Sequence, residues 1–593
     1  TVSPKSKERV AECLELTQRE IRRLLEFGIS PQEFEAAKLS TAQRFRLDRE
    51  LNREEVKSEE LVNAAINHFL RNHPLIGPVE LKDIQNRILS GITLESVRDY
   101  PAKMLAESEL IYSTCYNDVE EPGIAPSPDE VRAILAKVGA EQLEPQFAEF
   151  PTLDLTVNAE PGSIVKRKTD KRLGGYEEWL LSNGVKVYYR QADPIKTNYH
   201  LVMTWRFDTG YRSYPADKVD ASRFAASLIH RTVGFRGLER PELKNSPELS
   251  GVNIITHTLQ QAASIDIDAS LGKEEEAFKT GWLLLMEPYF GKESSLERTK
   301  EDRLKKLARK KSPRTLFDER YEREVYGNHP WLHPVDSAAV AAVDMAFLKD
   351  IYARAFGDFG SLSLYICSDG DKAAIEEYVC KYVASLRGDY PYKKANTPLP
   401  KPVLKGGNLI TETNPPESEP LSVVKYTFVK PIKTTTRNIL LSDFLDYIVS
   451  ARYVSLIREE RGGTYHVGFS SDIPDNPALP WKGIVAFQTR PEMTDLLVGD
   501  VKDVLADMAK NGPTAEEMDQ ARKYIRKRHG EVERRTAMSM MLQQERLVYT
   551  ALWNRDFDCD YDAMLDGIKA CEVRNLARKL TSGTSIIEIY NEK

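Results

Sequence analysis

The sequence has few cysteines and no long apolar run. The longest apolar stretch, near residues 282–286, is far shorter than the roughly 20 residues that a membrane-spanning helix needs. The cysteines form no Cys-x-x-Cys pair and have no ligand-like spacing, which favours isolated, mostly buried thiols over a disulfide or metal framework. These cysteines are Cys13, Cys115, Cys367, Cys380, Cys559 and Cys571. We therefore expect no membrane span and no cysteine-built site.

The chain also lacks a strong excess of charge of one sign. Its net charge is −7 over 593 residues, which argues against a nucleic-acid partner held mainly by phosphate contacts. A chain of this length is too long for a single core, so we expect three or four domains. It begins at Thr1 rather than Met, so we expect the native N-terminus to be missing. The compartment stays open, with a bacterial periplasm or cell envelope favoured over the cytoplasm.

The first part of the chain, residues 1–115, is predicted to be helical. Val10–Leu25 has apolar residues at helical spacing and is followed by Gly28, a residue typical of helix ends. Ser30 and Glu33 then form the pattern of a capping box that opens the next helix. A further helix is expected over residues 93–105.

Two α+β units follow, each after a linker. Residues 116–171 are predicted to be a linker with one short helix (129–138), 172–390 an α+β unit, 391–404 a second linker and 405–593 a second α+β unit. The Asn183-Gly184 pair between two β-rich runs predicts a hairpin. Strands are expected at 179–181, 185–189, 200–207, 263–269, 362–367, 423–429, 464–469, 483–489 and 584–590. Helices are expected at 221–235, 273–286, 295–310, 345–356, 372–386, 436–460, 492–510 and 515–549.

An internal repeat links the two ends of the chain. The segment around Gly28 and its capping box matches the segment around Gly512, which lies 484 positions later. Val97-Arg98 matches Val573-Arg574 at an offset of 476. Two similar offsets over some 70 residues indicate a duplication. If the copies share their length, about 80 residues of the first copy are expected to precede Thr1.

One motif resembles a known family. In the run from Ile457 to Gly468, Arg458 is followed by glycines and then, seven positions after the Arg, by Tyr465. This spacing is similar to that in the fourth domain of the pitrilysin/insulinase metalloendopeptidases. The sequence segments 179–190, 326–330 and 512–522 also resemble that family. The resemblance implies an α+β fold of repeated units, each an antiparallel-type sheet with helices on one face, of the LuxS/metallohydrolase-like type. It makes residues 1–115 the helical C-terminal part of a second domain, 172–390 a third domain and 405–593 a fourth.

In that family the first domain binds zinc through an H-x-x-E-H motif and a later Glu. None of the nine histidines here begins such a motif. His329 and His333 are four apart, but Leu332 stands where the Glu should be, and Pro330 argues for a loop. His68 and His73 are five apart and do not share a helix face well.

In the third domain the motif positions fall on Leu228, Arg231 and Thr232, which are not the expected zinc ligands. The resemblance therefore implies zinc in the full-length protein and none in this chain, with no catalytic residue in this chain.

The resemblance assigns Arg458 and Tyr465 to substrate binding. An Arg offers a charged fork of donors and a Tyr offers a hydroxyl, and both can bond a peptide carbonyl or the oxyanion formed during attack. The competing interpretation is a surface Arg in a charged run and a Tyr that packs in a strand.

Three functions remain open from the sequence. The first is the C-terminal portion of a zinc metalloendopeptidase that is inactive alone, closes the peptide chamber and needs the N-terminal catalytic half and peptide substrates as partners. The second is a non-catalytic scaffold or peptide-binding subunit that pairs with a separate catalytic subunit. The third is an unrelated multidomain binding protein. An H-x-x-E-H motif upstream of Thr1 would separate the first two.

Overall fold

The structure is a computed structural model of the chain, and it divides into two compact units. The first unit holds residues 1–153 and 245–250, and the second holds 154–244 and 251–593. The residues that the structure describes are 9–45, 58–106, 126–147, 152–192, 199–210, 214, 216–259, 261–392, 400–404, 408–416, 419–474, 476, 479–537 and 539–592. Across these ranges no helix is both long and apolar enough to pass through a membrane.

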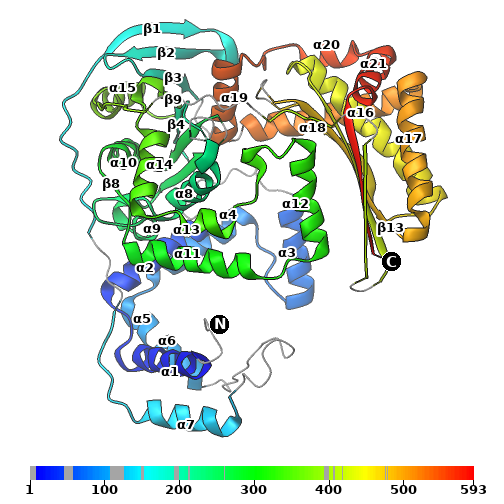
Figure 1. Cartoon of the computed structure of the whole chain (residues 1–593). Coiled ribbons are helices and arrows are strands. Elements are labelled where there is room, and N and C mark those ends of the chain that lie inside the picture. The colour runs from blue at the N-terminus through cyan, green and yellow to red at the C-terminus, as the bar shows by residue number, and fades with distance from the viewer. Residues whose placement is uncertain are drawn as a thin grey trace. The chain divides into compact units, whose positions relative to one another are not determined.

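The first unit is helical, as the sequence predicts (Figure 1). The expected capping box is present, because Ser30 Oγ accepts from Glu33 N and Ser30 N donates to the Glu33 carboxylate at 2.7 Å. The single helix expected over 93–105 is wrong: it is split at Asp99, and Pro101, which has no N–H to donate, lies in the first turn of the second piece. The helices are α1 (Val10–Phe27), α2 (Pro31–Arg44), α3 (Ser58–Arg71), α4 (Pro78–Gly91), α5 (Leu94–Arg98), α6 (Tyr100–Ala106) and α7 (Pro128–Gly139).

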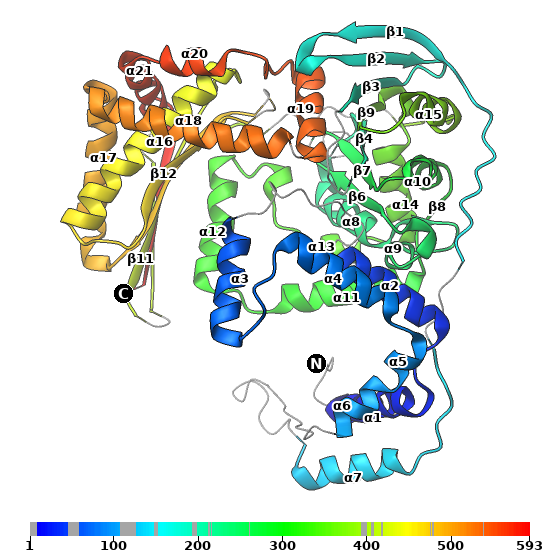
Figure 2. The ribbon, with the colours of Figure 1, turned by 180° about the vertical axis from the view of Figure 1, so that it is seen from behind.

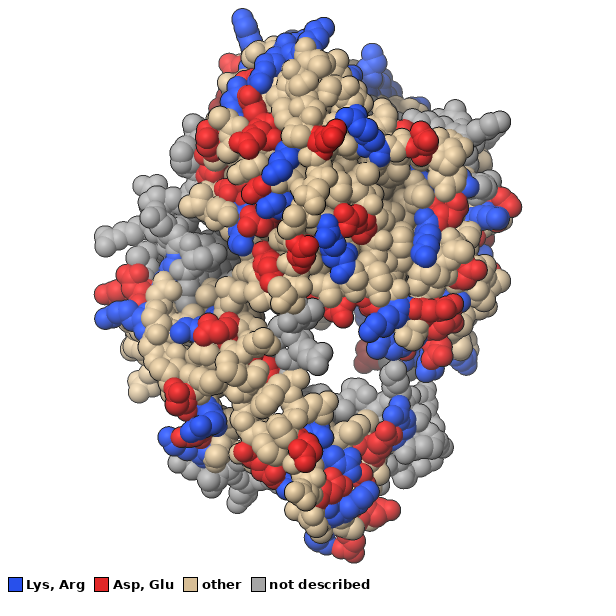
Figure 3. Space-filling view, turned by 90° about the vertical axis from the view of Figure 1, so that its left-hand side faces the viewer, with Lys and Arg blue, Asp and Glu red and all other residues tan. Residues whose placement is uncertain are grey.

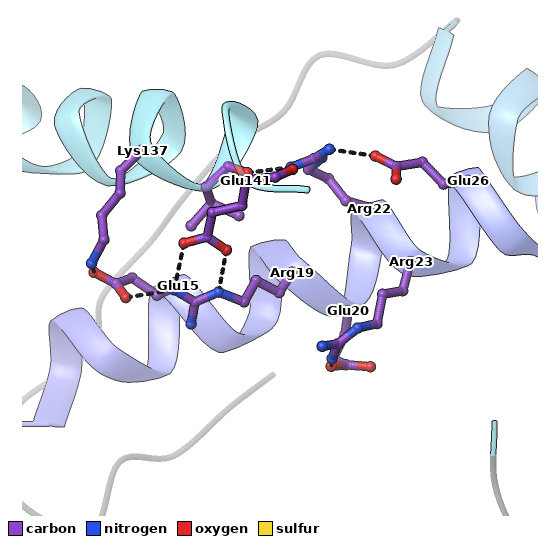
Figure 4. Close-up of polar contacts among 9 residues, drawn as sticks. Glu15, Arg19, Glu20, Arg22, Arg23, Glu26, Lys137 and Glu141 are labelled. Atoms are coloured by element: carbon purple, nitrogen blue, oxygen red, sulfur yellow. Dashed lines mark hydrogen bonds and ion pairs between the residues drawn. The ribbon is translucent and has the colours of Figure 1, made fainter. Parts of the chain in front are cut away.

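The short helix in the first predicted linker is present as α7, and ion pairs tie it to α1 (Figure 4). Arg19 of α1 donates from two nitrogens to Glu141, which follows α7, at 2.6 and 2.8 Å. Glu15 of α1 accepts from Lys137 of α7 at 2.7 Å. Val138 of α7 is fully buried, so α7 belongs to the core of the first unit.

The second unit contains two mixed sheets. The first has seven strands in the order β1-β2-β3-β9-β4-β7-β6, with β3 and β9 parallel and all other pairs antiparallel. The predicted hairpin joins β2 to β3, and Gly184 supplies a φ of +87°. The strands are β1 (Ile164–Asp170), β2 (Tyr176–Leu181), β3 (Lys186–Gln191), β4 (Leu201–Phe207), β6 (Val252–Thr258), β7 (Ala263–Ala269) and β9 (Ser363–Ser368). Gly234–Phe235 and Pro288–Tyr289 form a separate short pair, β5 and β8.

The edge strand β1 lies in a segment predicted to be a linker, so that prediction is wrong for residues 164–170. The strand has no fully buried residue, and its five central residues are exposed. An edge strand with charged side chains on both faces shows no apolar alternation, and so its sequence gives no strand signal.

One face of the first sheet is covered by helices from the same part of the chain. Trp205 of β4 packs against α10, where an added Cβ at Gly281 would lie 2.6 Å from the indole. Phe207, on the same face, makes an edge contact with Phe356 of α14 at 5.7 Å. The helices of this part are α8 (Val219–Thr232), α9 (Arg240–Lys244), α10 (Glu274–Met286), α11 (Glu293–Ala308), α12 (Pro313–Val325), α13 (Ser337–Ala341), α14 (Met345–Phe356) and α15 (Lys372–Tyr378).

The opposite face of the first sheet is covered by α19 (Met540–Trp553), which comes from much later in the chain (Figure 2). Leu547 of α19 is fully buried in a cluster with Tyr176 and Tyr365. Gln544 Nε2 donates to Thr204 Oγ1 at 2.7 Å, and Arg190 donates to Gln543 at 3.1 Å. The expectation of helices on one face therefore holds only for the helices that belong to the same part of the chain.

The second sheet has five strands in the order β10-β14-β11-β13-β12, with β10 and β14 parallel. Buried side chains from its helices form one apolar core against it. The strands are β10 (Asn408–Asn414), β11 (Leu421–Lys430), β12 (Val467–Asp472), β13 (Trp481–Thr489) and β14 (Thr584–Glu592), and the helices are α16 (Thr436–Tyr453), α17 (Thr494–Lys510), α18 (Ala515–Ala537), α20 (Tyr561–Asp566) and α21 (Ala570–Thr581).

The two sheets exchange helices. While α19 covers the first sheet, α12 of the first part lies against β14 of the second sheet. Phe317 of α12 is buried, and its ring centroid lies 5.5 Å from that of Tyr590. Asp318 accepts a hydrogen bond from Lys425 of β11 at 2.6 Å. The predicted α+β fold of repeated sheet-and-helix units is thus confirmed, with mixed rather than purely antiparallel sheets.

The prediction of one long helix over 515–549 is wrong, because the helix is interrupted between α18 and α19. Ser539 has an extended backbone and caps α19 through a bond from Leu542 N. At the start of α19, Met540 is buried and Met541 is half exposed, while Met538 lies outside the described residues. The thiols of Cys13, Cys367, Cys380, Cys559 and Cys571 are free, and Cys115 lies outside the described residues.

The predicted repeat has matching local structure at both ends of the chain. Gly28 and Gly512 have φ values of +69° and +78°. Each is followed by a capping box, in which the backbone N–H of Ser30 or Thr514 donates to a glutamate three residues later at 2.7 Å.

On the face that Figure 3 shows, basic and acidic side chains are interspersed rather than gathered by sign.

Candidate functional site

The candidate site is the reversal between α16 and β12. The last part of the predicted long helix is a π-helical segment, Val454–Glu460, a form that is frequent at functional sites. Gly462 has a φ of +59°, and Gly463 N then donates to Ile457 O at 3.0 Å. The chain therefore turns back directly beside the helix end.

Three contacts hold this turn in place. A Cβ at Gly463 would lie 2.7 Å from Leu497 of α17, so the close approach requires a glycine. Thr489 Oγ1 donates to Gly463 O at 2.7 Å in a buried position. Arg461 pairs with Asp500 of α17 at 3.0 Å. The turn is thus fixed to both the sheet and the neighbouring helix.

Arg458 and Tyr465 lie at the two ends of this turn. Arg458 is exposed on the π-helical segment, and Tyr465 has 97% of its surface exposed. The strand predicted from residue 464 begins only at Val467, because the reversal that starts at Gly462-Gly463 continues to that point. Tyr465 therefore precedes the sheet. Neither side chain has a hydrogen bond or ion pair to another described residue, and so none joins the two. The interpretation of Tyr465 as a residue packed in the sheet is therefore wrong.

The strand after the turn is tied to α16 at two points. Ser450 Oγ donates to Phe469 O and accepts from Phe469 N, both at 2.9 Å. Asp446 accepts from Ser471 Oγ at 2.6 Å and from Ser471 N at 2.9 Å. Burial raises the pKa of Asp446 to about 7. These contacts fix the start of β12 and hence the position from which Tyr465 extends.

The histidine pair closest to a metal motif does not make a metal site. His329 and His333 flank a single 3₁₀ turn rather than lying on a helix. His329 Nδ1 accepts from Trp331 N at 3.3 Å, and His333 Nε2 bonds Asn328 O at 2.8 Å. Each ring therefore has a local backbone partner.

The residues at the expected motif positions on α8 also do not fit zinc. Leu228 and Thr232 of α8 are buried, Arg231 is exposed, and Thr232 Oγ1 donates to Leu228 O at 2.9 Å. Within the described ranges, no three His, Cys, Asp or Glu side chains gather so that they could hold a metal ion.

The sequence did not reveal the residues that anchor the turn. The Gly462-Gly463 pair signalled a reversal, but Leu497, Asp500 and Thr489 are distant in sequence and carry no motif. Chemically, the site offers a guanidinium fork and a phenol hydroxyl as donors.

Comparison with known proteins gives consistent matches. Residues 343–525 match the family model of the peptidase M16 inactive domain. A protein from Arabidopsis thaliana, described as zinc protease PQQL-like, is 21% identical over 491 residues, which cover 79% of this chain and 47% of that protein. The chain thus spans about half the length of this relative.

Two solved structures have the same fold over almost the whole chain. The periplasmic protease PqqL from Escherichia coli matches with a TM-score of 0.61 and 16% identity. A mutant of the ferredoxin protease FusC, in complex with Arabidopsis ferredoxin, matches with a TM-score of 0.64 and 16% identity. Each match covers 98% of this chain and 63% of the solved chain. These findings confirm the resemblance drawn from the sequence: the chain is similar to pitrilysin-like M16 peptidases and has their fold.

Proposed function

We propose that this chain is the C-terminal portion of a zinc-dependent metalloendopeptidase. It closes the chamber in which a peptide is cut, and an N-terminal domain outside this chain supplies zinc and the general base. Support comes from the M16 relatives, which are described as proteases and extend well beyond the part matched here. The residues at the motif positions of α8 are not zinc ligands, which supports a role for this chain that does not include holding the metal.

The domain assignment is part of the same proposal. Residues 1–115 are the helical part of a second peptidase-like domain, 172–390 a third that binds no metal, and 405–593 a fourth. Linkers at 116–171 and 391–404 separate them, although residues 164–170 join the first sheet as β1.

The observation that carries the proposal is the exposure of Tyr465. A large aromatic side chain that is 97% exposed gains almost nothing from burial, yet its turn is anchored by buried contacts. This combination suits a side chain that binds something outside the chain. We assign Tyr465 and Arg458 to bonding the substrate carbonyl, or the oxyanion that forms when water attacks it.

A metal and activity assay tests the proposal. This chain alone is expected to hold no stoichiometric zinc after dialysis and to leave a quenched peptide uncut. The longer protein, with the upstream region restored, is expected to hold one zinc and to cut the peptide. One tightly held zinc in this chain, or an inactive zinc-free longer protein, would reject the proposal.

The second candidate is a non-catalytic scaffold or peptide-binding subunit that pairs with a separate catalytic subunit. The match to the M16 inactive domain favours keeping it. The same assay separates the two, because a scaffold would gain activity only from a separate zinc-bearing chain and not from its own upstream region.

A further inference from the structure

Helix α3 of the first unit repeats α19 of the second unit. Both helices have 14 residues, and both end at an asparagine with left-handed backbone, Asn72 (φ +56°) and Asn554 (φ +55°). These asparagines are 482 positions apart, an offset between the 484 and 476 of the flanking repeat segments.

The hydrogen bonds that close the two helices repeat at the same offset. His73 N donates to Asn67 O at 3.4 Å, and Arg555 N donates to Tyr549 O at 3.2 Å. In both, the amide that follows the left-handed asparagine donates to the carbonyl six positions before it, in the last turns of the helix. The register between α3 and α19 is therefore fixed by geometry as well as by sequence.

In α19 the residues of one face are buried because they cover a sheet. Met540, Gln543, Gln544, Leu547 and Thr550 are buried, and Val548 and Ala551 pack beside the cluster around Leu547. In that cluster, α19 contacts Tyr176, Tyr188 and Tyr365 of the seven-stranded sheet and Leu173 in the turn that precedes β2. The face of α19 is thus defined by its contact with β-sheet side chains.

The equivalent face of α3 is apolar and exposed. The positions that match Gln543, Gln544, Leu547, Val548 and Ala551 are Leu61, Val62, Ala65, Ile66 and Phe69. No described residue of α3 is buried, and Phe69 is 85% exposed. Burial of large apolar side chains is favourable, so a stripe of four of them left in water is costly.

We propose that α3 is an exchanged helix whose apolar face docks on a β-sheet of the N-terminal catalytic part of the longer protein, as α19 docks on the seven-stranded sheet. The proposal rests on the proposed function for the existence of that part. The surface that binds α3 is expected to be a sheet face, because α19, its equivalent in the repeat, covers one. It is a predominantly apolar sheet face, because Leu61 and Val62 replace the two glutamines with which α19 bonds Thr204 and Arg190.

Hydrogen exchange in the longer protein tests this docking without any assay of activity. Amides of residues 58–71 are expected to exchange about 100-fold more slowly in the longer protein than in this chain alone, because docking suppresses local opening. Amides of residues 540–553 are expected to be protected equally in both and report that the second unit is folded. Equal exchange of residues 58–71 in the two proteins would overturn the proposal.

Matched variants locate the contact. In the longer protein, Phe69→Asp is expected to raise the exchange of residues 58–71 at least about tenfold, whereas Asn63→Asp, on the opposite face of α3, changes it less than about twofold. Equal effects of the two variants would also overturn the proposal. If protection in this chain alone rises with its concentration, the occupant is a second copy and the proposal is wrong. A longer protein that protects α3 but binds no zinc would reject the proposed function and leave the docking intact.

Discussion

Gly512 lies against the side chain of Arg574, so closely that a Cβ on the glycine would be 3.0 Å from Arg574 Cβ. The other end of the chain has the same arrangement, because a Cβ on Gly28 would be 2.9 Å from Arg98 Cγ. The sequence had paired these glycines and these arginines by two separate offsets. That they meet in both places is what a duplication of one folded unit requires.

This contact gives a prediction about stability. Gly512→Ala should lower the free energy of unfolding by about 1–2 kcal/mol, because an L-residue at a φ of +78° is strained and the new methyl meets Arg574. Gly530→Ala, within α18, should raise it by about 0.5–1 kcal/mol, because a Cβ there meets nothing within 4 Å. Urea unfolding of both variants measures the difference. Equal effects of the same sign would contradict the account.

Glu588 gives a prediction about pH. The residue is 1% exposed on β14, and neither carboxylate oxygen has a hydrogen bond to another described residue. Its neighbour across the sheet, Lys425, donates to Asp318 of α12 instead. Burial therefore raises the pKa of Glu588 from 4.5 to about 7.

Between pH 4.5 and 7 the folded chain keeps a proton that the unfolded chain has released, so stability falls as pH rises through this window. Glu588→Gln cannot ionise and should remove this slope, with a gain on the order of 2 kcal/mol at pH 8 and little change at pH 4. Unfolding curves at the two pH values test this. Glu531→Gln, an exposed change on α18, serves as the control and should stay within about 0.5 kcal/mol at both. A pH-independent effect of Glu588→Gln would show that the carboxylate is not protonated in the fold.

The sequence could predict what local chemistry determines. The hairpin at Asn183-Gly184 and the capping box at Ser30 depend on a few adjacent residues, and both are present. Edge strand β1 could not be predicted, because it buries too little to show a pattern. The break at Ser539 and the exchange of α12 and α19 depend on partners hundreds of residues away.

The site was partly predictable for the same reason. The spacing of Arg458, the glycines and Tyr465 indicated a reversal with two polar side chains at its ends. It could not show that Tyr465 would stand 97% exposed ahead of the strand, since that depends on Thr489 and Leu497 holding Gly463.

The role of Arg458 can be tested by a change that keeps its charge. Arg458→Lys in the longer protein should lower kcat/KM by about tenfold, because a single ammonium cannot reproduce the planar fork of donors. Arg534→Lys, an exposed arginine on α18, should leave kcat/KM unchanged. Steady-state kinetics with a quenched peptide measures both, and equal kcat/KM in the two variants would remove Arg458 from the site.

The central claim is that Tyr465 donates its hydroxyl to the reacting peptide, and kcat/KM of Tyr465→Phe in the longer zinc-bearing protein tests it most directly. Tyr524→Phe is the matched control, because Tyr524 is half exposed and its ring packs at a tilt against Tyr447, and melting curves confirm that both variants fold. The account predicts that Tyr465→Phe loses about 10²-fold or more in kcat/KM while Tyr524→Phe and both melting temperatures stay at the wild-type values. Wild-type kcat/KM in Tyr465→Phe would contradict it.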